Sequence, residues 1–314
     1  MDLTARKPEF DILGIGTIAV DDALYVEHYP PPDGKARVKR EARTLGGLVA
    51  TALAAASRLD ARCAYGAMLG DDELSRVARG GLADAGIDCR FVERAPDAGP
   101  VHSVIVIDES AKTRNIFFNV ARQKPLPAAR IEEPMIGCAK VLLLDQSGVE
   151  TTIRAASCAH RLGMPVVMDM EWSQAPRVEE MMSAADHLLV PYDFSAAITG
   201  LSRPEETVGE LHRRHRRACT AVTYGKRGCY FLTAADRGAA FHMQAPVVQT
   251  AETTGCGDVF HGAYAAALAR GDTVIHCLRF ATAAAAAFAA RPAGWQNLPT
   301  NEDVNPLLSS METL

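Results

Sequence analysis

The sequence predicts an α/β protein with a doubly wound, mostly parallel sheet and helices on both faces. Short apolar, β-branched runs alternate along the chain with amphipathic, alanine-rich segments. Such runs are typical of parallel strands that are buried on both sides, and their alternation with helices favours a doubly wound sheet. Two more polar stretches interrupt the alternation and predict a second, smaller β-sheet with one face in solvent.

The elements follow in chain order. We expect strands at residues 10–15, 63–68, 141–144, 165–168, 187–190 and 221–223, and helices at 47–59, 263–270 and 281–290. A further helix begins near Asp71, Asp72 and Glu73, because negative charge is favourable at a helix N-terminus. No apolar run reaches the roughly 18 residues of a membrane span.

The polar stretches 25–44, 101–108 and 114–119 predict strands that stand apart from the main sheet, the last two joined as a hairpin through 109–112. We therefore expect a single domain over residues 1–314, with a small β lid inserted from about residues 24–45 and 100–119. The formal net charge of −5 argues against a nucleic-acid partner. Residues 1–9 lack the apolar core of a signal peptide, which favours a cytoplasmic location.

The eight cysteines are scattered singly, without the paired spacing of a disulfide framework or a zinc site. Most of them are expected to be small buried side chains. Cys256 differs because it lies inside a glycine-rich motif.

The strongest chemical signal is this motif, TTGCGDVFHG at residues 253–262, directly before a helical segment. Glycines at a helix start leave free backbone N–H groups that point at one spot, where the helix dipole adds positive potential. This arrangement can stabilise a phosphoryl group during transfer. Asp258 could cap the helix or accept the proton of an attacking hydroxyl. His261 lies on the same helical face, three residues later.

Four motifs together resemble the ribokinase-like (PfkB) family of carbohydrate kinases. The family's C-terminal DTxGxGD is matched by ETTGCGD at 252–258, and its glycine pair before a helix by Gly46 and Gly47, with LGDD following at 69–72. Its first-strand turn ending in aspartate is matched by GIGTIAVD at 14–21, and its late TxGxxG by TYGKRG at 223–228. The motifs occur in family order, so the resemblance covers nearly the whole chain.

The resemblance implies the same fold, an ATP-dependent transfer of phosphate to a sugar, and a role for each motif. Asp258 would be the catalytic base, with the backbone of Gly255, Cys256 and Gly257 stabilising the transferring group. Residues implied to hold the sugar are Asp21, Gly46, Gly47, Thr51 and Asp169. Residues implied to bind ATP are Thr223, Gly225, Gly228 and Thr254. The lid would close over the sugar and exclude water. Since such lids often pair between subunits, a homodimer is expected.

Departures from the family pattern concern the cations. The family's Asn-x-x-Glu element, associated with magnesium, would fall at 192–195, where the sequence is YDFS. Asp193 is then the remaining candidate for holding a water of the metal shell. Mg²⁺ is still expected, because ATP arrives with it. The leading aspartate of the last motif helps to order a monovalent-cation site in several members; here it is Glu252, so activation by K⁺ is open.

In detail the sequence looks like the branch that contains bacterial sulfofructose kinase. This resemblance rests on GGLVAT at 46–51, on GDVFHG at 257–262, on Asp169 and on the missing Asn-x-x-Glu element. A sulfonated sugar would need cationic partners. The candidates in or beside the lid are Lys35, Arg37, Arg43, Arg114 and Arg122, and each can equally be a plain surface charge.

Three alternatives stay open. A nucleoside kinase of the same fold is the main one, with Tyr25 and Tyr29 as the aromatic residues near Asp21 that could stack on a base. A second is a protein that binds sugar or nucleotide without turnover, since fold does not fix activity. A third is a nicotinamide-dependent oxidoreductase, but Ala19 stands where the dinucleotide fingerprint needs its last glycine.

Overall fold

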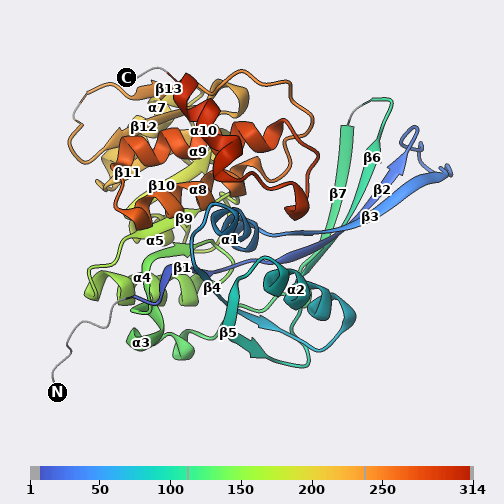
Figure 1. The fold of residues 1–314 in the computed structure, drawn as a ribbon, viewed down its shortest axis with the longest axis horizontal. Coiled ribbons are helices and arrows are strands. Elements are labelled where there is room, and N and C mark those ends of the chain that lie inside the picture. The colour runs from blue at the N-terminus through green and yellow to red at the C-terminus, as the bar shows by residue number, and fades with distance from the viewer. Residues whose placement is uncertain (1–7, 112, 237, 312–314) are drawn as a thin grey trace.

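The computed structural model describes residues 8–111, 113–236 and 238–311. Within them, nine strands form the main sheet and four form a separate one (Figure 1). Lys112 and most of the N-terminal segment on which the expected location rests lie outside these residues. No helix of the described chain is long and apolar enough to cross a membrane.

The main sheet has the expected doubly wound character. Its strands lie side by side in the order β13 (Phe241–Met243), β12 (Cys229–Thr233), β11 (Cys219–Thr223), β10 (His187–Pro191), β9 (Val166–Asp169), β8 (Ala139–Leu144), β1 (Phe10–Ile15), β4 (Cys63–Leu69) and β5 (Asp88–Arg94). All neighbours from β11 to β5 are parallel, and only β12 and β13 are antiparallel. The central strands are almost wholly buried, which explains their continuous apolar runs.

Helices cover both faces of this sheet, and each face has its own apolar core. One core is formed with α1 (Leu48–Arg58), α2 (Glu73–Asp84), α8 (Cys256–Arg270), α9 (Val274–Ala289) and α10 (Asn301–Ser310). The other is formed with α3 (Glu133–Ile136), α4 (Val149–Arg161), α5 (Val178–Ser183), α6 (Tyr192–Thr199) and α7 (Pro204–Arg214). Single 3₁₀ turns occur at η1 (Ala128–Arg130), η2 (Gly225–Arg227) and η3 (Trp295–Asn297).

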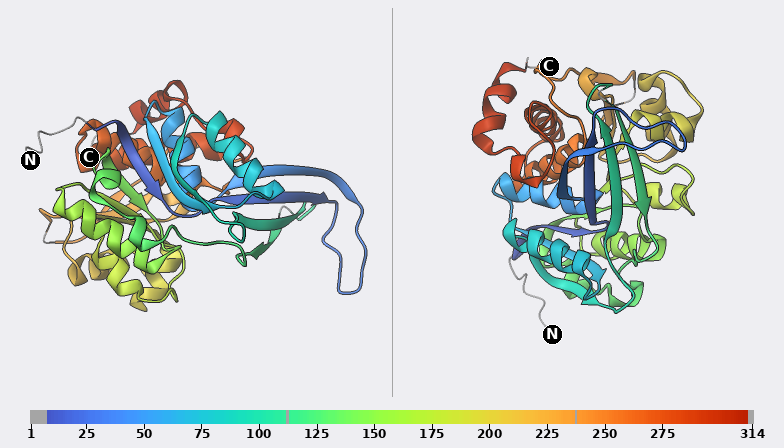
Figure 2. Two further views of the ribbon diagram at one scale, coloured as in Figure 1. Left: turned by 90° about the horizontal axis from the view of Figure 1, so that it is seen from below. Right: turned by 90° about the vertical axis from the view of Figure 1, so that its right-hand side faces the viewer.

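The second sheet is the predicted lid, and it projects from one side of the body (Figure 2). Its order is β3 (Val38–Gly46), β2 (Ala19–Val26), β6 (Val101–Asp108) and β7 (Thr113–Asn119). The lid therefore begins at residue 19 rather than near residue 24. Asp21, expected in a turn, lies within β2 and pairs in register with Thr44 of β3 and Ser103 of β6.

The order of the main sheet determines where a ligand can bind. The chain winds outwards from β1 in both directions, through β4 and β5 on one side and through β8 to β11 on the other. In open parallel sheets, ligands bind beyond the carboxyl ends of the strands at such a reversal of strand order. The residues at that edge are Gly16 after β1, Asp145 after β8, Asp169 in β9, Asp193 after β10 and Thr223 in β11.

Helices α1 and α8 approach each other unusually closely. A Cβ atom added to Gly262 of α8 would lie 2.0 Å from the backbone oxygen of Ala52 in α1. Glycine at 262 and the small alanines of α1 allow this contact, since a larger side chain would push the helices apart.

We predict that Gly262→Val destabilises the protein by at least about 1–3 kcal/mol, because the backbone of α1 cannot yield as a flexible side chain would. Denaturant unfolding measures the change. The matched control is Gly209→Ala in α7, where an added Cβ meets nothing within 4 Å. It should stabilise the protein by about 0.5–1 kcal/mol through helix propensity. Equal stability of the two variants would contradict this account of the contact.

Candidate active site

The glycine motif forms an open helix start. Helix α8 begins at Cys256, and Gly255 is its N-cap in the left-handed region with φ of 82°. Asp258 is the third helical residue, and no side chain makes a capping hydrogen bond. The capping hypothesis for Asp258 is therefore wrong, and its carboxylate is free for another role.

Several polar groups around this helix start have no partner. Among the described residues, the backbone N–H groups of Gly257 and Asp258 donate to no protein acceptor, whereas Cys256 N donates to Thr253 O and Val259 N to Gly255 O. The hydroxyl of Thr254 is also buried without a partner in that part of the chain. Buried polar groups are normally hydrogen-bonded. Together with the helix dipole, these groups form a site for an anion.

Four other carboxylates are close enough to Asp258 to influence its pKa. Asp145 and Asp169 are buried at the ends of β8 and β9. Burial, then Asp169, Glu171, Asp145 and Asp21, raise the pKa of Asp258 well above the usual aspartate value. Glu171 lies beyond β9 and is exposed on one side; desolvation by the surrounding protein, with Asp169 next, raises its pKa to about 7. A carboxylate with a raised pKa is suited to accept a proton near neutral pH.

No lysine or arginine within the described ranges forms a salt bridge with any of these five carboxylates. Asp145 is instead held by the backbone N–H groups of Thr17, at 2.7 Å, and of Ser147, at 2.8 Å. Sequence reasoning missed Asp145 and Glu171. The available signal was an acidic residue placed just after each of two apolar strands, since such positions meet at one edge of a parallel sheet.

The predicted sugar residues at the lid base are brought together. A Cβ on Gly46 would lie 2.4 Å from the Asp21 carboxylate, so only glycine lets this side chain lie against the backbone. Gly47 has φ of 92°, and its Cβ would lie 2.6 Å from Ile18 Cα. The pKa of Asp21 is raised, chiefly by burial, while a hydrogen bond from Ser103 acts in the opposite direction.

The other two predicted sugar residues are less accessible. Thr51 is buried in α1, and its hydroxyl accepts a hydrogen bond from the Trp295 Nε1–H at 3.1 Å. Asp169 is 2% exposed and contacts His261, while its Oδ1 has no partner among the described groups. The sugar contacts of Thr51 and Asp169 therefore stay predictions. Trp295 thereby ties the loop after α9 to α1.

The TYGKRG motif forms the turn between the antiparallel strands β11 and β12. Gly225 has φ of 54° and is exposed, and an added Cβ would meet nothing within 4 Å. Gly228 differs, since its φ is 89° and its Cβ would lie 1.9 Å from Met243 O. Gly228 is thus required by the turn itself, whereas Gly225 leaves backbone open to a ligand. Next to it the rings of Tyr192 and Tyr224, which sequence reasoning did not select, pack 4.7 Å apart.

The candidate cation residues lie at the same edge of the sheet. Asp193 is exposed in the first turn of α6. In the described part of the chain, no three His, Cys, Asp or Glu side chains are grouped so as to hold a metal ion by themselves. A divalent ion would therefore need oxygen ligands from a bound molecule. Glu252 accepts a hydrogen bond from the Ala293 N–H at 3.2 Å, which links the motif to the loop after α9.

Two of the candidate lid cations are already neutralised. Arg43 pairs with Asp22 and Glu73, both at 2.7 Å. Arg122 pairs with Asp72 at 2.9 Å. The surface-charge interpretation fits both, while Lys35, Arg37 and Arg114 are exposed.

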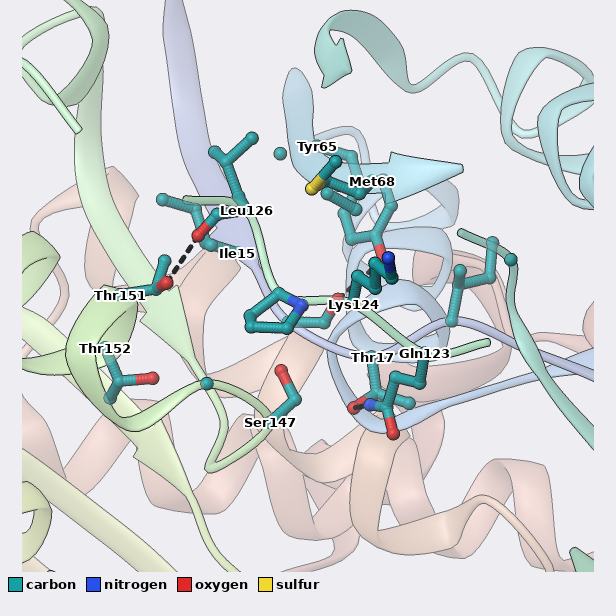
Figure 3. A pocket seen from close by; sticks show the side chains of 17 residues that line it. Ile15, Thr17, Tyr65, Met68, Gln123, Lys124, Leu126, Ser147, Thr151 and Thr152 are labelled. Carbon is teal, nitrogen blue, oxygen red and sulfur yellow. Dashed lines mark hydrogen bonds between the residues drawn. The ribbon is translucent and has the colours of Figure 1, made fainter. Parts of the chain in front are cut away.

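A small cavity lies between the turn after β1 and the segment that returns from the lid (Figure 3). Thr17, Gln123 and Ser147 line it, and Gln123 Nε2 donates to the Thr17 hydroxyl at 3.1 Å. No residue predicted to bind sugar or ATP lines this cavity. Its walls include Thr17 and Ser147, whose backbone N–H groups donate hydrogen bonds to the Asp145 carboxylate.

Comparisons with known proteins agree with the fold and the motifs. Residues 10–301 match the model of the pfkB family carbohydrate kinases. The chain is similar to a ribokinase of Arabidopsis thaliana, at 23% identity over 94% of this chain and 80% of that protein. It is also similar to an aminoimidazole riboside kinase of Salmonella typhimurium, at 25% identity over 84% of this chain and 88% of that protein.

Among solved structures, the Arabidopsis thaliana ribokinase complexed with ribose and ATP superposes with a TM-score of 0.83. Its sequence identity is 21%, with 95% of this chain and 98% of that chain covered, so this likeness speaks for the fold. The family match supports the activity class, an ATP-dependent transfer of phosphate to a hydroxyl. The family match over residues 10–301 shows that the chain belongs to the pfkB family of carbohydrate kinases, and its glycine motif and two sheets agree with this.

Proposed function

We propose that the protein transfers the γ-phosphoryl group of ATP to a hydroxyl of a small sugar, with Asp258 as the base. The observation that carries this proposal is the arrangement at the start of α8. There the Asp258 carboxylate, which makes no capping hydrogen bond and has a raised pKa, lies in the first helical turn with free backbone N–H groups, and Asp21 is close enough to contribute to that pKa.

The chemistry follows from these positions. The sugar would lie against Gly46 and Gly47, with Asp21 accepting hydrogen bonds from its hydroxyls. The reacting hydroxyl would give its proton to Asp258 as its oxygen attacks the γ-phosphorus, and the bond to the β-phosphate oxygen would break with ADP as the leaving group. The N–H groups of Gly257 and Asp258 and the Thr254 hydroxyl would stabilise the charge on the transferring group.

The unpaired carboxylates fit a nucleotide that arrives with Mg²⁺, since oxygen donors are its preferred ligands. Bound Mg²⁺ would neutralise charge on the triphosphate. Asp193 would hold one of its waters from the start of α6. Whether K⁺ binds near Glu252 stays open.

A neutral sugar suits the pocket better than the alternatives. The guanidinium of Arg40 covers the Tyr25 ring at 3.4 Å, so that ring is not free to stack on a nucleoside base. A sulfonate would be repelled by the carboxylates around Asp258 and would have to point along the lid, towards Arg40 and Arg114. These two lie on the same row and face of the lid as Tyr25. The sulfofructose kinase branch therefore stays a prediction.

Asp258→Asn keeps the shape of the side chain and removes the base. We expect kcat to fall by about 10²–10⁴, while ATP binding stays nearly unchanged. Release of ADP with a panel of ketoses, aldoses, sulfonated sugars and nucleosides, together with ATP titration of the variant, measures both. Near-normal turnover in the variant would disprove the proposed role.

Gly225 offers a clean test of the nucleotide site, because a side chain there meets nothing in the protein and Asp or Asn tolerates its left-handed φ. Gly225→Asp should raise the KM for ATP about tenfold by charge repulsion, with the KM for sugar unchanged. Gly225→Asn has the same shape without the charge and should differ little from the unmodified enzyme. Equal effects of the two variants on ATP would contradict this site.

We also propose that a second copy of the chain packs against the lid. The lid face that bears Asp21 carries Ile116 and Phe118, which are 47% and 69% exposed. The opposite face is partly covered by α2, because Leu45 fits against Gly81 of that helix. β7 is also an unprotected edge strand, which proteins seldom leave uncovered. The chain's own symmetry-related lid is the simplest apolar partner.

Phe118→Asp should convert this dimer into a monomer, since it places a charge in an apolar contact. Analytical ultracentrifugation measures the change in mass. Phe117→Asp is the matched control, because Phe117 is 55% exposed but points to the other face of the same strand. A monomeric unmodified protein, or equal effects of both substitutions, would argue against this interface.

A further inference from the structure

His261 is a buried histidine with oxygen atoms at both ring nitrogens. Its Nε2 lies 2.8 Å from Leu189 O of β10, and its Nδ1 lies 2.8 Å from Gly257 O in the first turn of α8. The same Nδ1 lies 3.2 Å from Asp169 Oδ2. His261 and Asp169 are 3% and 2% exposed, so solvent does not substitute for these partners.

These contacts constrain the protons on the ring. A backbone carbonyl oxygen can only accept, and a neutral imidazole donates from one nitrogen alone. The other nitrogen would then direct its lone pair at a carbonyl oxygen 2.8 Å away, in either tautomer. Protonating Asp169 instead does not remove that clash. Only the imidazolium form satisfies Leu189 O and Gly257 O together.

Burial acts against the charged form. It lowers the pKa of His261 overall, and the Leu189 and Gly257 carbonyls and Glu171 offset only part of that effect. The contacts of both ring nitrogens with carbonyl oxygens are what favours the charged ring. The titratable groups nearby are Asp169 of β9, Asp258 of α8, Glu171 after β9 and Asp145 after β8. All of these are acidic, and none pairs with a lysine or arginine within the described ranges. An imidazolium is therefore the single positive group available to them there.

We propose that His261 is a positioning residue in the doubly protonated, charged form, and that it orients the peptide between Gly257 and Asp258. The carbonyl of that peptide belongs to Gly257, and its N–H belongs to Asp258 and points out of the helix start. Holding the carbonyl directs the N–H towards the transferring phosphoryl group. The role of His261 in catalysis rests on the proposed function, whereas its protonation state does not.

His187 supplies a matched comparison at the same interface between β10 and α8. It too is buried, but it has one hydrogen-bond contact in the described structure, from its Nδ1 to the Tyr264 hydroxyl at 2.9 Å. Burial lowers its pKa to about 4. Because this pKa lies well below 7 and only one ring nitrogen has a partner among the described residues, His187 should carry one ring proton near neutral pH.

The first measurement uses the unmodified protein, labelled with ¹⁵N-histidine. Long-range ¹H–¹⁵N spectra at pH 7–8 should show two protonated ring nitrogens for His261 and one for His187. His261→Asn and His187→Asn assign the signals. This result does not depend on turnover, so it stands or falls separately from the role of Asp258. A single protonated nitrogen at His261 would overturn the inference.

The second measurement compares the kinetics of the two variants. Asn at 261 is too short to reach both carbonyls, so kcat should fall by about 100-fold with little change in either KM, as expected for a misplaced catalytic group. His187→Asn should lose stability but keep kcat. If His261→Asn folds and its kcat matches that of His187→Asn, the positioning role is excluded; if it does not fold, the spectra of the unmodified protein still decide.

Discussion

The close contact between α1 and α8 determines the geometry of the rest of the site. The Gly46 and Gly47 turn leads directly into α1, and α8 begins with the proposed anion-binding backbone and Asp258. Because Gly262 packs against the backbone of Ala52, no flexible side chain separates the two helices at that point. The distance between the proposed base and the proposed sugar turn is therefore set by two rigid elements, as catalytic geometry requires.

The second determinant is electrostatic. Five carboxylates lie around one helix N-terminus, and no lysine or arginine of the described residues pairs with them. Backbone N–H donors and the proposed His261 imidazolium oppose their charge. Charges arranged in this way are costly in isolation. Binding of a cation or a proton lowers this electrostatic energy. The site is therefore suited to receive the metal ion of a nucleotide and the proton of an attacking hydroxyl. The Asp145 carboxylate also has a structural role, because its two hydrogen bonds join the turn after β1 to the loop after β8.

Local motifs predicted the fold and much of the candidate site. A glycine pair before a helix, or a glycine-flanked aspartate, determines its local backbone structure within a few residues and can therefore be recognised in the sequence. The lid boundary was missed since the strand that carries Asp21 follows β1 after three residues and has no turn signal of its own. Asp145 and Glu171 belong to no motif and become neighbours of Asp258 only through strand order. The contact of Trp295 with Thr51 joins residues 244 positions apart, and that of His261 with Leu189 joins residues 72 apart. Pairings of this kind follow from the tertiary structure alone.

The unpaired carboxylates also bear on how a catalytic cycle would end. A phosphorylated sugar carries about two negative charges near neutral pH, and it would be formed against Asp21 and Asp258, with Asp145 and Asp169 close behind. Once the nucleotide and its metal ion leave, the groups of the described residues that oppose this repulsion are the N–H groups of Gly257 and Asp258, because Arg43 in the lid base is already paired with Asp22 and Glu73. A pocket that binds a neutral sugar, as we propose, would thus be poorly suited to retain the phosphorylated one. Release of the sugar phosphate is expected to be fast, and inhibition by it weak.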